Sequence, residues 1–372
     1  MKYLFTLGHQ PHLSAAEIEA VFLRLDIKTK TTEQKNDSML IEVKEKLDCE
    51  ELIKTLGGTI KIAEKIKGDI VKHLMKARPE GKIEFSIADQ RRGLEIKKEL
   101  KAAGRSARYL EPKNTATILH SNLVEKQSDL TIIGDDVFVT RAIQDIESFT
   151  ERDYGRPGSD NKSGMLPPKL ARIMINLGIT SDNDVVLDPF CGSGTILTEA
   201  LSMGITNVIG SDISPAAISD TQKNIDWLVQ TYNLQLTTYN LYQSNVINLS
   251  DVVEPQSVDT IITEPYLGKP LRGLETREFL VDQARSLAEL YLNAFHIFYS
   301  VLKPGGNIVM VFPKYQYKNE WIRIEILEKI KKIGFAVFPS TLQGEGSGVR
   351  CLTYHRPTQH LAREIWRFKK GS

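Results

Sequence analysis

The most constraining feature of this sequence is residues 185–195, which read Val-Val-Leu-Asp-Pro-Phe-Cys-Gly-Ser-Gly-Thr. Apolar residues end at Asp188, a turn with Gly192 and Gly194 follows, and the next segment, Ile-Leu-Thr-Glu-Ala-Leu, predicts a helix. A strand, a tight turn and a helix in this order indicate a doubly wound α/β sheet, whose ligands bind at the carboxyl ends of the strands. The two glycines allow the backbone to approach such a ligand closely.

The spacing of these glycines excludes two common phosphate-binding turns. A dinucleotide turn requires G-x-G-x-x-G and a P-loop requires G-x-x-x-x-G-K-[ST], whereas Thr195, Ile196 and Leu197 follow Gly194 here. Asp188 would repel a pyrophosphate but would attract a cationic ligand, of which a sulfonium with an amino-acid tail is one. An ordinary βα turn with incidental glycines is the alternative.

Length, charge and cysteine content limit the remaining possibilities. The chain has 372 residues, which is enough for two or three domains, and its formal net charge is +1. A nucleic acid would therefore have to bind to a local basic patch. Three widely separated cysteines indicate neither a disulfide framework nor a zinc site. No apolar run suits a signal peptide or a membrane span, so we expect a cytoplasmic protein without a membrane or metal partner.

The first half of the chain predicts two small α+β units that end near residue 146. The predicted strands are residues 3–7, 39–43, 59–63, 83–87, 130–133 and 137–142. Arg105, Arg108 and Lys113 form a basic stretch beside a turn. Such a stretch suits phosphate contacts, which position a nucleic acid without reading its sequence. A solvated surface with scattered charges is the alternative.

In the second half, strands and helices alternate regularly. Asp212 follows Gly192 by twenty positions and ends the second strand. The second strand lies beside the first in a doubly wound sheet, so Asp212 can accept hydrogen bonds from a ribose diol. Asp212 or Ser214 could instead cap the helix that follows.

The turn at residues 188–195 resembles motif I of the S-adenosylmethionine (SAM)-dependent amino-methyltransferases. The resemblance implies SAM as the cofactor. The implied cofactor-binding residues are Asp188, Phe190, Gly192, Gly194, Thr195, Asp212, Ile213 and Asn245. Asn245 stands at the end of the third strand, where resembling enzymes carry a residue that accepts a hydrogen bond from the adenine amine.

In the same family the exit from the fourth strand reads [DNS]-P-P-[YF]. Here the four positions are Thr263, Glu264, Pro265 and Tyr266, so only the last two match. Hydrogen-bond acceptors at this exit free the lone pair of an exocyclic base amine, and the aromatic ring stacks on the base. We expect these four residues to form the catalytic site and favour Glu264 as its polar group, with the Thr263 hydroxyl as the alternative.

Two further features follow the fourth strand. Lys269 and Arg272 lie on a loop at its exit and could bind a phosphate next to the target base, although a solvated loop is an equal alternative. Residues 335–338 and 350–354, joined by the glycine-rich residues 343–348, predict an antiparallel hairpin.

The first half, including its basic stretch, resembles the THUMP domain of tRNA-modifying enzymes. We therefore expect a Rossmann-like class I methyltransferase domain preceded by an α+β, THUMP-like RNA-binding region. The predicted parts are a ferredoxin-like unit (1–60), the THUMP-like domain (61–146), a linker (147–168) and the methyltransferase domain (169–372).

This arrangement resembles the tRNA methyltransferases that modify the N2 amine of guanosine, the guanosine-10 group in particular, and implies tRNA as the partner. A DNA adenine or cytosine amino-methyltransferase shares the fourth-strand chemistry but would lack the THUMP-like half. A catalytically weakened RNA-binding homologue is a further alternative, because Thr263 and Glu264 depart from the family pattern.

Overall fold

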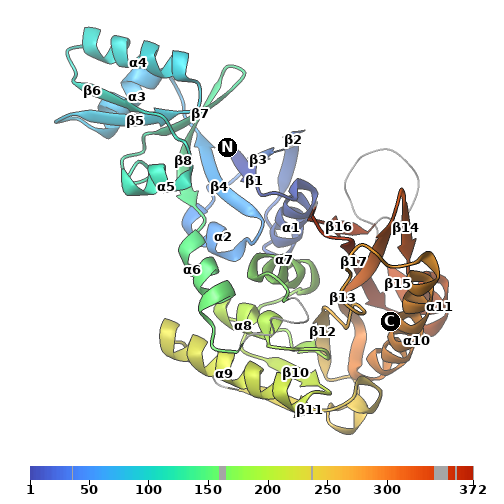
Figure 1. The fold of residues 1–372 in the computed structure, drawn as a ribbon. Helices are drawn as coiled ribbons and strands as arrows, with labels where there is room; N and C mark the ends of the chain where they lie inside the picture. Colours follow the sequence, from blue (N-terminus) through green and yellow to red (C-terminus); the bar gives the residue numbers. More distant parts are fainter. Residues whose placement is uncertain (36, 159–164, 236–237, 339–350, 357, 372) are drawn as a thin grey trace. The chain divides into compact units, whose positions relative to one another are not determined.

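The computed structural model describes residues 1–35, 37–158, 165–235, 238–338, 351–356 and 358–371 (Figure 1). Its contacts divide the chain into two compact units. The first unit comprises Met1–Ala15 and Leu25–Asp145, and the second comprises Ala16–Arg24 and Ile146–Ser372. The two units are described separately below.

The first unit is built on one eight-stranded sheet with the order β2-β3-β1-β4-β8-β7-β5-β6. Its strands are β1 (Lys2–Leu7), β2 (Thr29–Lys35), β3 (Ser38–Val43), β4 (Thr59–Lys65), β5 (Ile83–Ile87), β6 (Ala107–Leu110), β7 (Asp129–Ile133) and β8 (Asp136–Ile143). Its helices are α1 (Pro11–Arg24, which ends in the second unit), α2 (Cys49–Thr55), α3 (Ile70–Ala77), α4 (Gln90–Ala102) and α5 (Thr115–His120).

The sheet of the first unit is continuous across residue 60, where the sequence predicts a boundary. Residue 60 lies inside β4, which pairs with β1 on one side and with β8 on the other. A buried carboxylate helps to join the strands, because Asp129 accepts hydrogen bonds from Lys61 (3.0 Å), Ser86 (2.5 Å) and Thr140 (2.5 Å). These partners offset the cost of burying its charge.

Four helices of the first unit begin with the same local device. Asp48, Asp69, Asp89 and Asn114 each accept a hydrogen bond from the backbone N–H three residues later, at the starts of α2, α3, α4 and α5. Short polar side chains satisfy an otherwise unpaired donor at this position. Helix α3 and the fully exposed strand β2 are absent from the sequence prediction; β2 has no apolar alternation that could reveal it.

The second unit is built on a nine-stranded sheet whose main path is β11-β10-β9-β12-β13-β17-β15. Its strands are β9 (Val186–Asp188), β10 (Val208–Asp212), β11 (Tyr239–Gln243), β12 (Val258–Thr263), β13 (Leu302–Tyr317), β14 (Glu320–Arg323), β15 (Phe335–Val337), β16 (Leu352–Tyr354) and β17 (Leu361–Lys370). Its helical segments are α6 (Ile146–Thr150), η1 (Glu151–Gly155), α7 (Pro168–Gly178), α8 (Thr195–Ser202), α9 (Pro215–Tyr232), η2 (Val246–Asp251), α10 (Arg277–Val301) and α11 (Leu327–Ile333).

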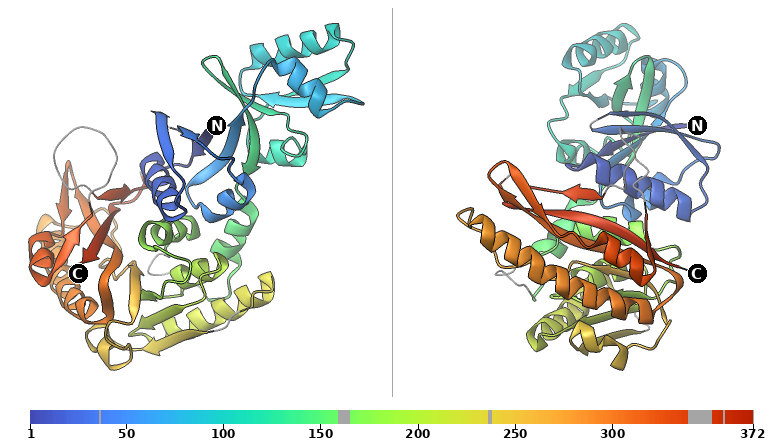
Figure 2. Two further views of the ribbon diagram at one scale, coloured as in Figure 1. Left: turned by 180° about the vertical axis from the view of Figure 1, so that it is seen from behind. Right: turned by 90° about the vertical axis from the view of Figure 1, so that its right-hand side faces the viewer.

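The five strands from β11 to β13 along this path are parallel, and β17 runs antiparallel between β13 and β15. Helices α7, α8 and α9 cover one face of the sheet, and α10 and α11 cover the other (Figures 1 and 2). The sheet is therefore doubly wound, as the sequence predicts, and the loops that follow β9, β10 and β12 leave from the same edge.

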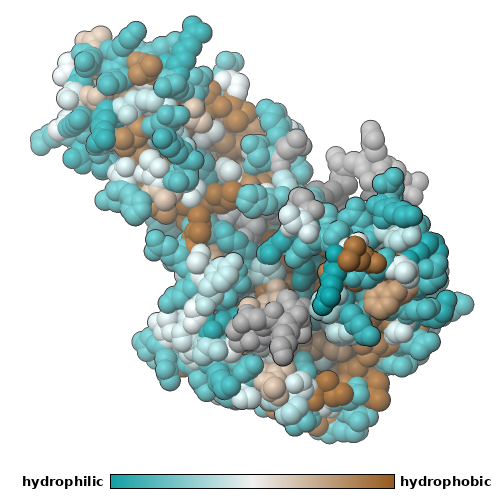
Figure 3. Space-filling model, in the orientation of Figure 1, coloured by the Kyte–Doolittle hydropathy of each residue, from teal (hydrophilic) through white to brown (hydrophobic). Residues whose placement is uncertain are grey.

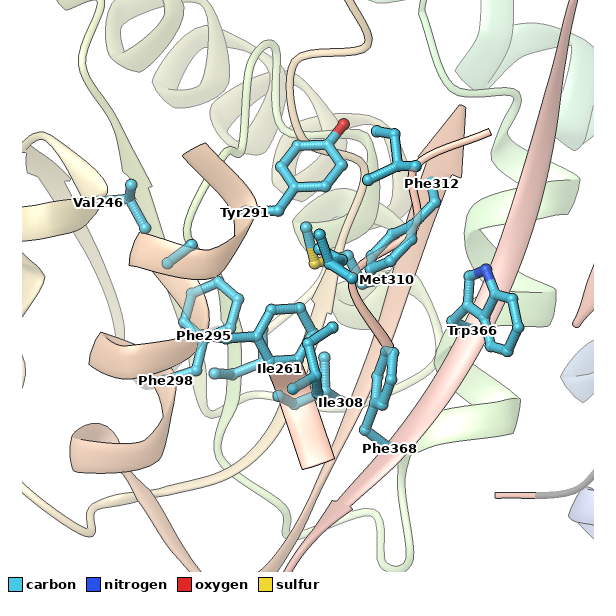
Figure 4. Packing of buried hydrophobic residues seen from close by; sticks show 14 of the residues in the cluster. Val246, Ile261, Tyr291, Phe295, Phe298, Ile308, Met310, Phe312, Trp366 and Phe368 are labelled. Carbon is cyan, nitrogen blue, oxygen red and sulfur yellow. The ribbon is translucent and has the colours of Figure 1, made fainter. Parts of the chain in front are cut away.

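Aromatic packing fixes α10 against the sheet (Figure 4). The ring centroid of Phe295 lies 5.0 Å from that of Phe368 and 5.4 Å from that of Phe335, in edge-to-face arrangements. Such pairs add to the stabilisation that comes from burying the rings. Tyr291 lies one helical turn before Phe295, and it is fully buried on the same face. The packing of α10 therefore also fixes the position of the Tyr291 side chain.

The predicted C-terminal hairpin is wrong. Strands β15 and β16 do not pair with each other; Phe335 lies opposite Lys370 and Leu352 lies opposite Ile365, so both strands pair with β17. Residues 343–348 and Arg350 lie outside the described residues.

Strand β17 was not predicted from the sequence, because charged residues interrupt its apolar pattern. Arg363 and Glu364 are nevertheless buried, because each meets an oppositely charged partner. These two charges are thus buried together with their partners, which lie on other segments of the chain, so the sequence of the strand alone does not show that it is an interior strand.

The predicted linker contains packed structure. The described part of residues 147–168 includes most of α6 and the whole π-helical turn η1. The contacts of this segment assign it to the second unit. Arg152 and Arg156 in this segment are each only 6% exposed. Residues 159–164 lie outside the described part of the chain.

The surface drawn in Figure 3 is mainly hydrophilic, with apolar residues in small groups. Among the described residues, no helix combines the length and the hydropathy that a membrane span requires.

Candidate functional site

The carboxyl ends of three neighbouring strands hold the residues that the sequence singled out. Strand β9 lies between β10 and β12 and ends at Asp188, while its neighbours end at Asp212 and Thr263. Residues from three separate parts of the chain are therefore brought to one edge of the sheet, as we expected.

The two glycines of the turn after β9 have different roles. Both have positive φ angles, +55° at Gly192 and +81° at Gly194. A Cβ atom on Gly194 would lie 2.7 Å from the Thr221 side chain, so this glycine is required by packing. A Cβ atom on Gly192 would meet no atom within 4 Å. The space beside Gly192 is therefore open to a ligand, and its backbone can be approached closely.

A hydrogen bond links this turn to the end of the next strand. The Gly192 N–H donates to a carboxylate oxygen of Asp212 at 3.0 Å, and the other oxygen accepts from the Ser214 N–H at 2.9 Å. Ser214, the alternative to Asp212 in the sequence analysis, is the residue that caps α9, because its hydroxyl accepts from the Ala217 N–H. The Asp212 carboxylate is thus held beside the glycine turn, where it is partly exposed.

Exposed apolar side chains follow the ends of β10 and β11. Ile213 is 65% exposed directly after β10, and Ile247 is 48% exposed in η2, which follows the adjacent strand β11. Two such side chains suit the faces of a flat, largely apolar ring. Ile213 is one of the cofactor-binding residues predicted from the sequence, whereas Ile247 was not predicted. The side-chain carbonyl of Asn245 accepts a hydrogen bond from the Ile247 N–H (3.2 Å) and thereby caps η2.

Asp188 is a buried carboxylate that is 2% exposed. One of its oxygens accepts hydrogen bonds from the Thr263 hydroxyl (2.7 Å) and the Phe190 N–H (3.1 Å). Within the described ranges, no Lys or Arg forms an ion pair with it. Burial raises the pKa of Asp188 to about 7, although both hydrogen bonds oppose the shift. A cationic ligand beside Asp188 would stabilise its ionised form.

The four residues at the exit of β12 differ in accessibility. Thr263 is completely buried and its hydroxyl donates to Asp188, so this side chain faces β9. Both oxygens of Glu264 accept hydrogen bonds from Arg363, with Nε at 2.6 Å and Nη2 at 3.1 Å. Pro265 is buried, whereas Tyr266 is 54% exposed. Of the two polar candidates, Glu264 is therefore the one with a partly accessible side chain.

Arg363 of β17 is a functional candidate that the sequence analysis missed. It forms a bidentate ion pair with Glu264, and the two side chains are 10% and 11% exposed. Such a pair fixes the plane of the carboxylate as well as its charge. The two residues lie 99 positions apart, so no local spacing connects them.

Buried tyrosines fix the backbone of the same exit. The Tyr291 hydroxyl donates to the Tyr266 carbonyl (2.8 Å), and the Tyr315 hydroxyl donates to the Leu267 carbonyl (2.7 Å). Gly268 has a φ of +94°, and a Cβ there would lie 2.8 Å from the Tyr315 hydroxyl oxygen. The main chain is thus held in place while the Tyr266 ring stays exposed, an arrangement suited to stacking on a planar substrate.

The segment that precedes the second sheet contacts the glycine turn. Arg156 donates from Nη1 to the Thr195 hydroxyl at 2.5 Å. Asn224 of α9 donates to the carbonyls of Gly158 (2.8 Å) and Ser193 (2.7 Å), and accepts from the Gly158 N–H. Residues 156–158 are therefore part of the structure around the turn, which the sequence analysis did not foresee.

The residues proposed to bind RNA are divided between the two units and differ in their contacts. In the first unit, Arg105 donates to the carbonyls of Arg78 and Gly81, Arg108 lies 3.6 Å from Glu84, and Lys113 is exposed. In the second unit, Lys269 and Arg272 are exposed on the loop after β12. Of the three residues in the first unit, Arg105 already binds backbone carbonyl groups of the same unit.

A second group of basic residues lines a groove in the first unit. It is lined by Lys2, Lys65, Lys67, Lys72, Lys76 and Arg141, with only Glu64 and Asp69 as acidic members. Lys67, Lys72 and Lys76 are exposed and form no ion pair with any residue described in the structure. The groove was not predicted from the sequence, because its lysines are spread over β1, β4, the unpredicted helix α3 and the connection between β4 and α3.

The described residues hold no group of three or more His, Cys, Asp or Glu side chains arranged to bind a metal ion.

Two family models of methyltransferases match parts of this chain. A family model described as a DNA methylase matches residues 35–223, and one described as an RMKL-like methyltransferase domain matches residues 156–337. The second match contains β9, β10 and the exit of β12.

The chain belongs to the methyltransferases.

The similar proteins include tRNA (guanine(10)-N2)-dimethyltransferases from two archaea. The Methanothermobacter thermautotrophicus protein is 33% identical over 187 residues, covering 50% of this chain and 49% of that protein. The Methanocaldococcus jannaschii protein is 37% identical over 195 residues, covering 50% of this chain and 48% of that protein. This methyltransferase thus aligns with about half the length of these relatives.

A solved structure supports the same fold. The crystal structure of TrmN from Thermus thermophilus aligns with 100% of both chains at a TM-score of 0.52 and 15% identity. The Rossmann-like methyltransferase fold predicted from the sequence is confirmed.

Replacing Asp188 tests the cost of its buried charge. Because the pKa of Asp188 is about 7 in the folded state and about 4 in an unfolded chain, the unfolded chain ionises first as the pH rises. Ionisation therefore favours unfolding between these two values. We expect Asp188→Asn to be more stable than wild type in the absence of ligand. The difference in stability should grow from pH 5 to pH 7 and stay constant at higher pH.

Thermal unfolding midpoints measured from pH 5 to pH 8 check this expectation. Asp251→Asn, which removes an exposed carboxylate, is the matched control. A difference between Asp188→Asn and wild type that does not change with pH would contradict the assignment.

Proposed function

We propose that this methyltransferase transfers the methyl group of SAM to the exocyclic N2 amine of guanosine in tRNA. The observation that carries the proposal is the junction of the three strand ends. The Gly192–Asp212 hydrogen bond joins the glycine turn to β10, and the Thr263–Asp188 hydrogen bond joins β12 to β9. A donor held at the turn and a base held at Tyr266 would therefore be neighbours, and the names of the archaeal relatives support the choice of substrate.

The residues at the strand ends fit SAM part by part. The Asp212 carboxylate suits the ribose diol, and the exposed Ile213 and Ile247 side chains suit the faces of the adenine. The open space beside Gly192 leaves room for the chain of the ligand. Asp188 supplies negative charge near the sulfonium and ammonium groups.

The chemistry at the exit of β12 follows from the properties of the amine. SAM supplies an electrophilic methyl group, whereas the lone pair of an exocyclic amine is delocalised into the base. Acceptors that bind the amine hydrogens make this lone pair available, and we assign that role to the Glu264 carboxylate, oriented by Arg363. The Tyr266 ring stacks on the base and directs the amine toward the methyl group.

The tRNA partner is assigned to the first unit, which we interpret as the THUMP-like region. RNA of defined structure is recognised largely through its shape and its phosphates, and the groove at Lys67, Lys72 and Lys76 offers free positive charge for such contacts. The target base would then be flipped out toward Tyr266. A tRNA substrate would place the protein in the cytoplasm.

Methyl transfer from labelled SAM distinguishes this function from its alternatives. We expect incorporation into unmodified tRNA transcripts that contain guanosine at position 10, and its loss when that guanosine is replaced by adenosine. Incorporation into duplex DNA instead of tRNA would favour a DNA amino-methyltransferase. Binding of tRNA without methyl transfer would favour a weakened homologue that only binds RNA.

Glu264→Gln tests the assigned acceptor. The substitution removes the negative charge and one acceptor oxygen, so we expect kcat to fall about 100-fold while the affinity for S-adenosylhomocysteine changes less than about threefold. Glu320→Gln is the matched control, since Glu320 forms an ion pair with Arg277 that is about half exposed. An unchanged kcat in Glu264→Gln would remove Glu264 from the catalytic site.

The basic groove is tested by a triple substitution, Lys67→Ala, Lys72→Ala and Lys76→Ala. Losing these phosphate contacts should weaken tRNA binding at least about tenfold. The slope of log K against the logarithm of the salt concentration should become shallower by roughly two to three. The affinity for S-adenosylhomocysteine should stay the same. Replacing Lys82, Lys98 and Lys101, which are exposed elsewhere in the first unit, controls for total charge. Equal losses in both triple variants would contradict a specific groove.

A further inference from the structure

Arg156 is a buried cation at the edge of the glycine turn. Its side chain is 6% exposed, Nη1 donates to the Thr195 hydroxyl (2.5 Å), and Nη2 lies 3.0 Å from the Met165 sulfur. Its Nε is buried and has no hydrogen-bond partner among the described residues. The guanidinium group therefore contacts one hydroxyl and one thioether, and neither neutralises its charge.

The nearby acidic residues do not form an ion pair with Arg156. Asp153 and Glu199 are the carboxylates that act on it, but neither lies within ion-pair distance. Both oxygens of Glu199 are already engaged, one by Arg152 at 2.5 Å and the other by Arg172 at 3.0 Å. Burial lowers the pKa of Arg156, as expected for a cation without a close counter-ion.

Arg156 also lies at the N-terminal end of a helix, where a positive charge is unfavourable. Thr195, its hydrogen-bond partner, is the first residue of α8, and no side chain caps that helix start. The N–H groups of a first turn carry partial positive charge, so a guanidinium placed there is unfavourable unless an anion lies between them. The buried, unpartnered Nε and the uncapped helix start thus indicate the same kind of ligand.

We propose that Arg156 and the first turn of α8 bind the carboxylate of the methionine part of SAM. This inference rests on the proposed function, because it assigns one more part of the same ligand. The turn at residues 188–195 then carries opposite charges at its two ends, the Asp188 carboxylate at the start and the Arg156 guanidinium at Thr195. The amino-acid end of SAM carries one ammonium and one carboxylate, which match these charges. A phosphate suits the site less well, because Asp188 would repel its higher charge.

Two ligands that differ in the amino-acid part test the proposal. S-adenosylhomocysteine contains the carboxylate, whereas 5′-methylthioadenosine has the same adenosine and sulfur but lacks the amino acid. We measure the dissociation constants of both by calorimetry for wild type, Arg156→Gln and Arg156→Lys. Arg156→Gln should bind S-adenosylhomocysteine about 10- to 100-fold more weakly, with the affinity for 5′-methylthioadenosine changed less than about twofold.

The conservative and control variants separate binding from folding. Arg156→Lys should recover part of the lost affinity, because it restores the charge but not the planar fork of the guanidinium. Arg152→Gln removes a buried arginine of the same segment that is already paired with Glu199. We expect it to change the affinities for the two ligands by equal factors, as a merely structural residue would.

The outcomes distinguish this proposal from the function on which it rests. If Arg156→Gln weakens both ligands equally, Arg156 only supports the turn and the inference is wrong. The inference also fails if wild type binds the two ligands with equal affinity, while SAM dependence stands. If wild type binds neither ligand, the SAM-dependent function itself fails, and this inference with it.

Discussion

The hydrogen bond from Thr263 to Asp188 is the interaction on which the site depends. Both side chains are buried at the ends of adjacent parallel strands, so the bond sets the distance between the exit of β12 and the glycine turn. The Gly192–Asp212 bond does the same for β9 and β10. Two short polar contacts at one sheet edge thus define the geometry in which a methyl donor and its acceptor could meet, while the faces of the sheet are held by apolar packing.

Much of this arrangement could be predicted because it is encoded locally. Residues 185–195 contain the strand, the turn and the helix start in a single segment, and the position of Asp212 follows from the regular alternation of strands and helices. In a parallel sheet, this alternation alone brings strand ends to the same edge. Gly192 is open to a ligand and Tyr266 is 54% exposed; the sequence predicts the first from residue type and the second from the family resemblance.

What could not be predicted depends on contacts between distant parts of the chain. The sequence suggested that the Thr263 hydroxyl could accept a substrate hydrogen bond, but the structure turns it toward Asp188. The partner of Glu264 lies 99 positions away on a strand whose charges obscure its apolar pattern. Arg156 lies in a segment that the sequence predicts to be a linker, but it is buried and contacts Thr195 at the start of α8. Patterns along the chain record the local structure but not these pairings.

The place of β17 in the sheet has a consequence for synthesis on the ribosome. The strand lies between β13 and β15 and supplies Arg363, although it is the last strand of the second unit along the chain. The nascent polypeptide therefore cannot complete this sheet until Leu361–Lys370 has been translated. Until then β13 and β15 lack the strand that lies between them, and the Glu264 carboxylate has no counter-ion from β17. The second unit thus acquires its final form only after β17 has left the ribosome.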